Sequence, residues 1–233
     1  MLSEKFGGLA PIVCVDSGST DGSIEHAREQ GVEVVELEIS LPFTAARARN
    51  ARFGRLKQLA PHLAFVTFVD GDCEVNPEWL RTAEEFLDPH AANGVVCGRR
   101  RDRCPDASVY NYLCDVEWNT AVGYADGCCG DAMMRVEAFA GVGGFNPSLI
   151  AGEEPELCVR LRAAGWKIYR LDREMTLHDA NVTRFSQWWK SLPEIFSGNG
   201  SPIIRESQMR GWPSTNDRLA SSYAARSSSL CSA

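Results

Sequence analysis

Short apolar segments alternate with amphipathic segments along most of the chain. Apolar runs rich in β-branched residues predict strands, and the segments between them carry helix signals. The predicted strands cover residues 11–17, 32–37, 64–69, 94–98, 132–136 and 167–171. The predicted helices cover residues 23–30, 44–59, 76–87, 108–120, 136–140 and 156–164. This alternation predicts an α/β fold with a parallel or mixed sheet flanked by helices.

Proline and glycine mark where several of these helices begin or end. Pro77 follows Asn76 and predicts the first helical position of the segment 76–87. Gly165 predicts a helix end, because glycine readily adopts the left-handed conformation that closes many helices. Residues 99–131 show no regular pattern apart from one predicted helix, and they begin with a basic stretch of four arginines around Asp102.

The last part of the chain has a different composition. Residues 191–233 contain 11 serines, whereas the preceding 190 residues contain 8. Glycine, proline and serine scatter through this segment without periodicity, which predicts a disordered tail. We therefore expect one α/β domain over residues 1–190 and a serine-rich tail over residues 191–233.

Charge and cysteine content narrow the classes of function. The 233-residue chain has a net charge of −7 and a pI of about 5.2, whereas nucleic-acid-binding proteins are expected to be basic. Its nine cysteines form no C-x-x-C pair, so we interpret them as small buried residues in a reducing compartment, with adjacent Cys128 and Cys129 as the exception. Neither a signal peptide nor a membrane-spanning run is visible, which predicts a cytoplasmic protein whose membrane contact would be peripheral.

The strongest chemical signal follows the strand at 64–69. This strand leads into Asp70 and Asp72, which are separated by Gly71. Ligands of open α/β sheets bind beyond the carboxyl ends of the strands. Two carboxylates on a flexible turn suit a Mg²⁺ or Mn²⁺ ion that also holds substrate phosphates. The alternative is an ordinary turn, in which Asp and Gly are common.

Two further groups of acids suggest chemistry. Asp16 ends the first predicted strand and could accept hydrogen bonds from a nucleobase or ribose, although the serines that follow it also suit helix capping. Glu153 and Glu154 lie just before a predicted helix, where acids complement the helix dipole. One of them could instead act as a general base, with a pKa raised by the neighbouring like charge.

Basic residues and one histidine complete the candidate set. His178 follows the last predicted strand, so it is a candidate third metal ligand as well as an ordinary structural histidine. Arg47, Arg49 and Asn50 lie on the predicted helix 44–59 between two candidate nucleotide loops. The arginines could pair with phosphates, or they could form a solvated helix face.

Together these segments resemble the family 2 glycosyltransferases, which are inverting enzymes with the GT-A fold. Residues 15–23 resemble the D-x-G-S-x-D-G-[ST] donor loop, residues 48–50 the A-R-N segment, and residues 68–72 the strand and D-x-D motif. Residues 134–145 resemble the segment before the acceptor site, and residues 152–161 resemble G-E-D-x-[DE]-L-x-x-R-L. Each piece is common, but five in order across residues 11–180 are specific.

The resemblance implies a reaction and a role for each matching residue. A nucleotide-diphosphate sugar binds with its diphosphate on Mn²⁺ or Mg²⁺, and a hydroxyl of an unidentified acceptor attacks the anomeric carbon with inversion. The implied metal ligands are Asp72, Asp70 and His178. The implied donor-binding residues are Asp16, Ser17, Asp21, Arg49 and Asp70. Glu154 is the implied general base, with Glu153 beside it.

The chain departs from the family pattern in three places. Glu154 stands where the family usually has Asp, and residues 1–10 do not supply the family's first strand, so we expect a sheet without it and an incomplete base pocket. The tail at 191–233 resembles nothing in the family. These departures leave open the alternative that the chain is a catalytically inactive relative, which binds a sugar nucleotide or acts as a scaffold. A nucleotidyltransferase is disfavoured, because residues 16–23 contain no basic side chain.

Overall fold

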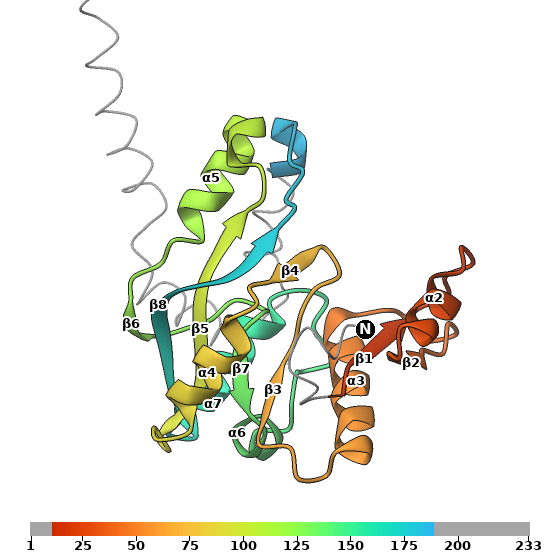
Figure 1. Cartoon of the computed structure of the whole chain (residues 1–233), viewed down its shortest axis with the longest axis horizontal. Coiled ribbons are helices and arrows are strands. Elements are labelled where there is room, and N and C mark those ends of the chain that lie inside the picture. Colours follow the sequence, from red (N-terminus) through yellow and green to blue (C-terminus); the bar gives the residue numbers. More distant parts are fainter. Residues whose placement is uncertain (1–10, 189–233) are drawn as a thin grey trace, which may run out of the picture. The chain divides into compact units, whose positions relative to one another are not determined.

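The computed structural model of the chain describes residues 11–188. Within this range, strands and helices alternate along the sequence as predicted (Figure 1). The strands are β1 (Val13–Asp16), β2 (Glu33–Glu36), β3 (Phe65–Thr67), β4 (Cys73–Val75), β5 (Asn93–Asp102), β6 (Gly123–Ala125), β7 (Met133–Arg135) and β8 (Lys167–His178). The helices are α2 (Ser23–Glu29), α3 (Ala45–Leu59), α4 (Trp79–Leu87), the 3-10 helix η1 (Pro105–Ala107), α5 (Val109–Glu117), α6 (Val136–Gly141) and α7 (Glu153–Ala163).

The described strands form two sheets. β1 and β2 pair in parallel and make a small sheet of their own. The other six strands form a mixed sheet in the order β3-β7-β5-β8-β4, with β6 also paired to β8. Only the β5–β8 pairing in this larger sheet is parallel, and its other ladders are antiparallel. The predicted mixed α/β architecture is therefore confirmed.

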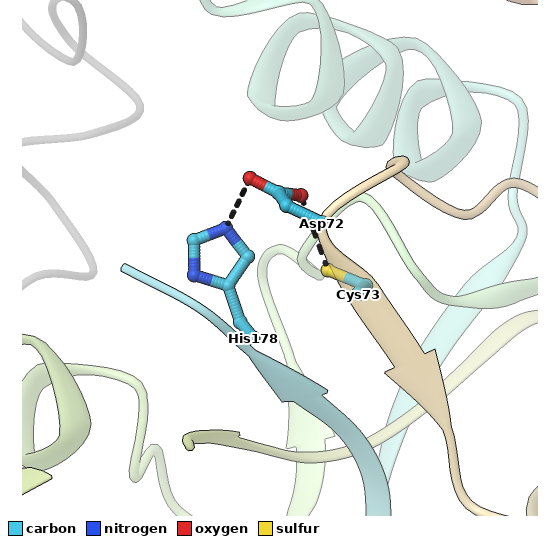
Figure 2. Close-up of side chains that lie close together, drawn as sticks. All are labelled: Asp72, Cys73 and His178. Atoms are coloured by element: carbon cyan, nitrogen blue, oxygen red, sulfur yellow. Dashed lines mark hydrogen bonds and ion pairs between the residues drawn. The ribbon is translucent and has the colours of Figure 1, made fainter. Parts of the chain in front are cut away.

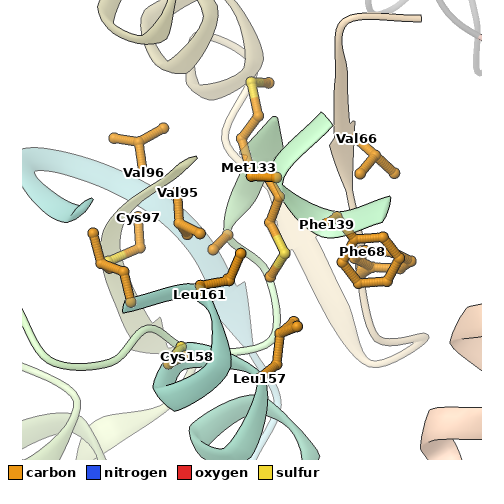
Figure 3. Close-up of a cluster of buried hydrophobic side chains, with 14 of the residues drawn as sticks. Val66, Phe68, Val95, Val96, Cys97, Met133, Phe139, Leu157, Cys158 and Leu161 are labelled. Atoms are coloured by element: carbon orange, nitrogen blue, oxygen red, sulfur yellow. The ribbon is translucent and has the colours of Figure 1, made fainter. Parts of the chain in front are cut away.

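Helices cover both faces of the larger sheet. Val95 and Val96 are neighbours on β5, so their side chains point to opposite faces, and both are completely buried. Trp79 and Leu87 bring α4 into the core, whereas Leu157 and Leu161 bring in α7. Figure 3 shows the α7 side chains packed against the sheet residues. This core fixes α7, and with it the acids at its N-terminus.

The two longest strands extend further than the apolar pattern indicates. β5 continues through the arginine stretch to Asp102, and β8 continues to His178, so the prediction of an irregular segment from residue 99 onward was wrong there. Arg99–Asp102 pairs with Glu174–His178 after register shifts in the ladder. The apolar signal ends early because these strand ends carry charged side chains. As a consequence, His178 lies inside a sheet rather than beyond it.

Other boundaries also differ from the predicted ones. The three-residue strands β4 and β6 carry no apolar run long enough to predict them. α4 begins at Trp79, so Pro77 precedes the helix instead of opening it. α7 begins at Glu153, three residues before the predicted start, with Gly152 as its N-cap residue. Gly152 has φ of 80°, a left-handed conformation that suits glycine and lets both acids enter the first turn.

Several predictions concern residues outside the described range. The absent first strand refers to residues 1–10, and the disordered tail refers to residues 191–233; both segments lie outside it. Within residues 11–188, none of the helices has the length and apolar character needed to cross a bilayer.

Candidate active site

The Asp70-Gly71-Asp72 turn divides the candidate site into two groups of side chains. The turn joins β3 to β4, and the Cys73 backbone N–H donates to the Asp70 carbonyl oxygen at 3.1 Å. Asp70 faces Arg49, which also contacts Glu153 and Glu154. We call these four residues the arginine cluster. Asp72 faces Cys73 and His178, which together we call the ligand cluster.

In the arginine cluster, three carboxylates from two segments converge on one guanidinium. Arg49 Nη1 donates to Glu153 Oε1 and to Glu154 Oε1, each at 2.6 Å. Its Nη2 donates to Asp70 Oδ1 at 2.8 Å. The Arg49 and Glu153 side chains are each 7% exposed, Glu154 is 19% exposed and Asp70 is 38% exposed. The structure thus brings four predicted site residues together around a buried ion-pair network.

Burial and the shared arginine shift the pKa values of these groups in different directions. Burial raises the pKa of Glu154, and repulsion from Glu153 adds to this shift against the attraction of Arg49. For Asp70, burial also acts upward, but Arg49 and Arg100 outweigh it and lower the pKa. Burial alone would lower the pKa of Arg49, but attraction by Glu154 and Asp70 raises it instead. Glu154 therefore accepts a proton more readily than Asp70 does.

The sequence around Arg49 explains how α3 reaches this position. Thr44 caps the helix, because its side-chain oxygen accepts a hydrogen bond from the Arg47 N–H at 3.1 Å. Ala46 and Ala48 are buried and small, so the first turns of α3 can approach the core closely. Arg47, by contrast, donates to backbone carbonyls of the preceding loop, including that of Leu41 at 3.0 Å. Arg47 therefore holds the loop, while Arg49 faces the acids.

Asn50 and Arg160 fix the turn that leads to α7. Asn50 Nδ2 donates to the Phe145 carbonyl at 2.7 Å, and the Phe145 N–H donates back to Asn50 Oδ1 at 3.0 Å. Arg160 donates to the carbonyls of Val142 and Gly144 at 2.6 and 2.7 Å. The asparagine of the A-R-N segment and the arginine of α7 are thus positioning residues, which hold the approach to Glu153 and Glu154.

The ligand cluster is formed where β4 pairs with β8. Cys73 and His178 are direct partners in that antiparallel ladder, and Asp72 precedes Cys73. His178 Nε2 lies 3.1 Å from Asp72 Oδ2, and one ligand atom from each of the three residues lies within 4.8 Å of the others. Figure 2 shows the His178 ring turned toward the Asp72 carboxylate, with the Cys73 thiol beside them. Asp70 is not in this cluster, although it was predicted to share the metal.

The surroundings of the ligand cluster are partly apolar and partly cationic. The Trp118 ring meets the His178 ring edge-on, with centroids 5.0 Å apart. The buried His178 Nδ1 has no hydrogen-bond partner among residues 11–188. Burial raises the pKa of the Cys73 thiol to about 12, and the repulsion of Asp131 adds to the shift. The thiol is thus neutral near pH 7 unless a bound cation changes the local charge.

Arg100 connects the two clusters. It pairs with the fully buried Asp131, and its Nη2 lies 3.5 Å from both Asp70 Oδ2 and Cys73 Sγ. The arginine stretch gave no functional prediction, and Cys73 and Asp131 were not predicted as site residues. Their sequence signal is weak, since Cys73 merely follows the D-x-D motif and Asp131 merely precedes a strand. The β5–β8 and β4–β8 pairings bring Arg100 and Cys73 beside the acids, and Asp131 reaches Arg100 from the loop before β7.

The predicted donor-binding loop lies after β1, on the smaller sheet. Asp16 Oδ2 accepts hydrogen bonds from the backbone N–H groups of Gly18 and Ser19 at 2.7 and 3.0 Å. A hydrogen bond from the Ser19 side chain, followed by these backbone bonds, lowers the pKa of Asp16. Asp21 accepts from the Ser23 N–H and hydroxyl at 3.1 and 2.6 Å, which orders the start of α2.

Ser17 is exposed in the same loop. Arg52, one turn beyond Arg49 on α3, donates to the Val69 carbonyl at 3.4 Å, and its buried Nε lacks a partner in the part of the chain that the structure describes. Arg52 was not predicted as a site residue, although it follows Arg49 by three positions and residues at this spacing are neighbours on a helix surface.

The fold is that of the GT-A glycosyltransferases, as comparison with solved structures shows. S. aureus TarS, residues 1–349, superposes with a TM-score of 0.56 at 17% identity over 85% of this chain and 59% of that chain. The mannosyltransferase PcManGT from Pyrobaculum calidifontis, solved with GDP-Man and Mn²⁺, also has a TM-score of 0.56 at 17% identity, over 96% of this chain and 66% of that chain.

The sequence comparison identifies the family. Residues 7–140 match the model of glycosyl transferase family 2, which is more than half of the chain, and the chain therefore belongs to this family. The succinoglycan biosynthesis protein ExoA of Rhizobium meliloti (strain 1021) is 28% identical over an alignment of 200 residues, which covers 78% of this chain. The chain spans 57% of the length of that relative. The predicted family and fold are thus confirmed.

Proposed function

We propose that the chain transfers a sugar from a nucleotide-diphosphate sugar to an acceptor hydroxyl, with inversion and with a divalent metal ion. Family membership supports sugar transfer. Structures of the GT-A neighbour TarS with UDP-GlcNAc and with UDP support a nucleotide-sugar donor. The Mn²⁺ complex of PcManGT supports the use of a divalent ion.

The observation that carries the proposal is the difference between Glu153 and Glu154. Both accept hydrogen bonds from Arg49 Nη1 at 2.6 Å, but Glu153 is 7% exposed and Glu154 is 19% exposed. A general base must reach the proton that it removes, so the more exposed acid suits the role. Burial also raises the pKa of Glu154, which brings its basicity closer to the range useful near neutral pH.

The ligand cluster fits a divalent ion. Asp72 offers carboxylate oxygen, His178 offers imidazole nitrogen, and the two groups already lie within 3.1 Å of each other. The mixture of oxygen and nitrogen donors suits Mn²⁺ better than Mg²⁺, which prefers oxygen ligands and water. We propose that Asp72 and His178 hold the ion, with Asp70 behind them. When bound, the ion supplies positive charge for the donor diphosphate and its departure.

In the proposed reaction, the chain's own residues move one proton. The Glu154 carboxylate takes the proton of the acceptor hydroxyl as the acceptor oxygen forms a bond to the anomeric carbon. The bond from that carbon to the diphosphate oxygen breaks, and its electron pair leaves with the nucleoside diphosphate. Attack in line with the departing group inverts the anomeric configuration.

We propose that Arg49 positions the acids rather than binding the donor directly. Its side chain is 7% exposed, and both of its terminal nitrogens donate to carboxylates. Through these bonds Arg49 holds Glu154 beside Asp70 and keeps the unprotonated form of Glu154 accessible despite burial. Arg52 is the nearby half-buried cation that is not paired with a carboxylate within residues 11–188, so we assign it to the donor phosphates.

The experiment compares nucleoside diphosphate release from UDP- and GDP-sugars with Mn²⁺ for the full chain and for three variants. Glu154→Gln should lower release by about 10²- to 10⁴-fold, because it removes the general base but keeps a hydrogen-bond acceptor for Arg49. Donor binding, followed by calorimetry, should change little. Glu137→Gln on the exposed side of α6 is the matched control and should release the product at the wild-type rate.

The third variant is Glu153→Gln, which tests which of the two acids is the general base. The binding data test whether the chain is an active transferase or an inactive relative. Release that falls with Glu153→Gln but not with Glu154→Gln would assign the base to Glu153. A wild-type chain that binds a donor with Mn²⁺ yet releases no product with any donor would instead favour the inactive sugar-nucleotide-binding relative.

A further inference from the structure

Two cysteine thiols touch beside the arginine cluster. Cys128 lies in the loop between β6 and β7, and Cys158 lies on α7, thirty residues later. Their Sγ atoms are 3.4 Å apart, a hydrogen-bond contact between two free thiols. A disulfide bond needs about 2.05 Å, so a movement of little more than 1 Å separates this contact from a covalent bond.

The contact differs from the vicinal pair that the sequence suggested. Cys128 and Cys129 are adjacent in the sequence, but it is Cys158 that Cys128 meets through its sulfur. The hydrogen bond between the two thiols raises the pKa of Cys128 and lowers the pKa of Cys158. Cys158 is buried, whereas Cys128 is half-buried. Because the two sulfur atoms are already in contact, a sulfenic acid formed on one cysteine would lie next to a second thiol, which favours its conversion to a disulfide.

The position of the pair links it to Glu154. Cys158 follows Glu154 by four residues on α7, so the two side chains lie one helical turn apart on the same face. The loop that carries Cys128 also carries Gly130, and a Cβ on Gly130 would lie 2.9 Å from Glu154 Oε1 and 3.2 Å from Arg49 Nη2. Any movement that closes the sulfur contact therefore acts on the two elements that enclose the candidate base.

We propose that Cys128 and Cys158 are a redox modification site, which a peroxide converts into a disulfide that misplaces Glu154. One thiolate attacks a peroxide oxygen, the O–O bond breaks, and a sulfenic acid forms. The second thiol then attacks the sulfenic sulfur, the S–S bond forms, and the hydroxyl leaves as water. For hydrogen peroxide, two thiols are oxidised to one disulfide, one peroxide is reduced, and two water molecules result. A thiol reductant reverses the change.

The first test maps the bond directly and does not depend on the proposed function. The reduced full chain is treated with hydrogen peroxide, remaining thiols are blocked with N-ethylmaleimide, and proteolytic peptides are analysed by mass spectrometry. A linked peptide pair containing Cys128 and Cys158 should become the main oxidised product and should disappear after treatment with dithiothreitol. A dominant link through any other cysteine, or sulfinic acid without a link, would overturn the proposal.

The second test measures the consequence for turnover and rests on the proposed function. Oxidation should lower nucleoside diphosphate release about tenfold or more, because a displacement of about 1 Å at a catalytic group can cost up to ~10²-fold. Dithiothreitol should restore release. Cys128→Ser should resist the loss, and Cys14→Ser, which changes an exposed cysteine of β1, should remain sensitive. A complete crosslink that leaves release unchanged would overturn the switch, whereas a chain inactive even when reduced would refute the proposed function instead.

Discussion

The arginine cluster and the ligand cluster flank the same Gly71 turn, but they differ in whether their carboxylates are paired with an arginine. In the arginine cluster, the Arg49 guanidinium already forms ion pairs with Asp70 of the turn and with two acids of α7, Glu153 and Glu154. In the ligand cluster, Asp72 lies 3.1 Å from His178 and forms no ion pair with an arginine or lysine within residues 11–188. Asp72 is 55% exposed, and His178 Nδ1 lacks a partner within residues 11–188.

This contrast is the reason that we propose a different role for each acid of the Asp70-Gly71-Asp72 turn. A buried carboxylate needs a permanent partner, because an unpaired buried charge costs several kcal/mol. Glu153 and Glu154 therefore depend on Arg49, which Asp70 shares, whereas Asp72, two residues later, is the carboxylate that we propose for an external cation. The four predictions that follow test this division, from the largest expected effect to the smallest.

The largest effect should come from removing the internal cation. Arg49→Leu leaves Asp70, Glu153 and Glu154 without their shared partner, and two of these acids are largely buried. We expect the free energy of unfolding to fall by about 3 kcal/mol, the lower end for a broken buried ion pair, since Asp70 is partly exposed. Urea denaturation followed by circular dichroism measures the change.

A matched exposed pair provides the control for this loss. Arg103 contacts Glu74 at 3.1 Å, but both side chains are about half exposed or more. Arg103→Ala should therefore cost less than about 1 kcal/mol. Equal losses in Arg49→Leu and Arg103→Ala would contradict the view that the arginine cluster is a buried network.

The next largest effect should come from removing the site for the external cation. Asp72→Asn should weaken Mn²⁺ binding at least tenfold, because it replaces a charged ligand with a neutral one. The loss of several kcal/mol of metal stabilisation should lower nucleoside diphosphate release by about 10²-fold or more. Calorimetry with Mn²⁺ alone measures the first effect independently of activity.

Glu74→Gln provides a neighbouring control, since Glu74 lies on β4 beside Cys73 but pairs with Arg103 instead of His178. This variant should bind Mn²⁺ as the wild type does. Asp72→Asn with unchanged Mn²⁺ affinity would refute the assignment of the ligand cluster.

The sequence predicted the arginine cluster's members better than their arrangement. Asp70, Glu153, Glu154 and Arg49 all carry motif signals, and the apolar strands and helices beside them follow from simple periodicity. That Arg49 pairs with acids from both α7 and the Gly71 turn could not be predicted, because a helix periodicity does not specify its tertiary partners. Asn50 was placed on the correct helix, but its two bonds to Phe145 depend on a turn 95 residues away.

The ligand cluster was harder to predict for a different physical reason. β4 has only three residues, and the end of β8 is charged, so neither produces the apolar run from which strands are recognised. These segments are held by ladder pairing and by ion pairs, such as that of Arg101 with Glu174. As a result, Cys73 was missed.

A smaller effect is expected from crowding the arginine cluster without changing its charges. A Cβ at Gly130 would approach Glu154 Oε1 to 2.9 Å, whereas a Cβ at Gly127 would have no heavy atom within 4 Å. Gly130→Ala should therefore displace Glu154 and lower nucleoside diphosphate release about tenfold, while Gly127→Ala in the same loop should leave it unchanged. Both variants should unfold at similar urea concentrations. Equal turnover in the two variants would show that the position of Glu154 does not limit the reaction.

The smallest expected effect concerns stability and pH. Burial raises the pKa of Glu154 above its value in the unfolded chain, so the folded state favours the neutral carboxyl. The associated stability is fully present below the unfolded pKa and is lost as pH rises through the folded pKa. Glu154→Gln removes this ionisation and should raise the free energy of unfolding at pH 7 by about 0.5–1 kcal/mol. The gain should vanish at pH values below both pKa values.

Asp70 provides the opposite case within the same cluster. Arg49 and Arg100 lower its pKa despite burial, so its contribution to stability is present above the unfolded pKa and is lost as pH falls through the folded pKa. Asp70→Asn should therefore destabilise the fold at pH 7, and the difference from wild type should shrink in acid. Urea denaturation across this pH range measures both variants. If Glu154→Gln and Asp70→Asn changed the free energy of unfolding at pH 7 in the same direction, the two acids would not have pKa values shifted in opposite directions. Glu154 would then not be the acid that accepts a proton more readily.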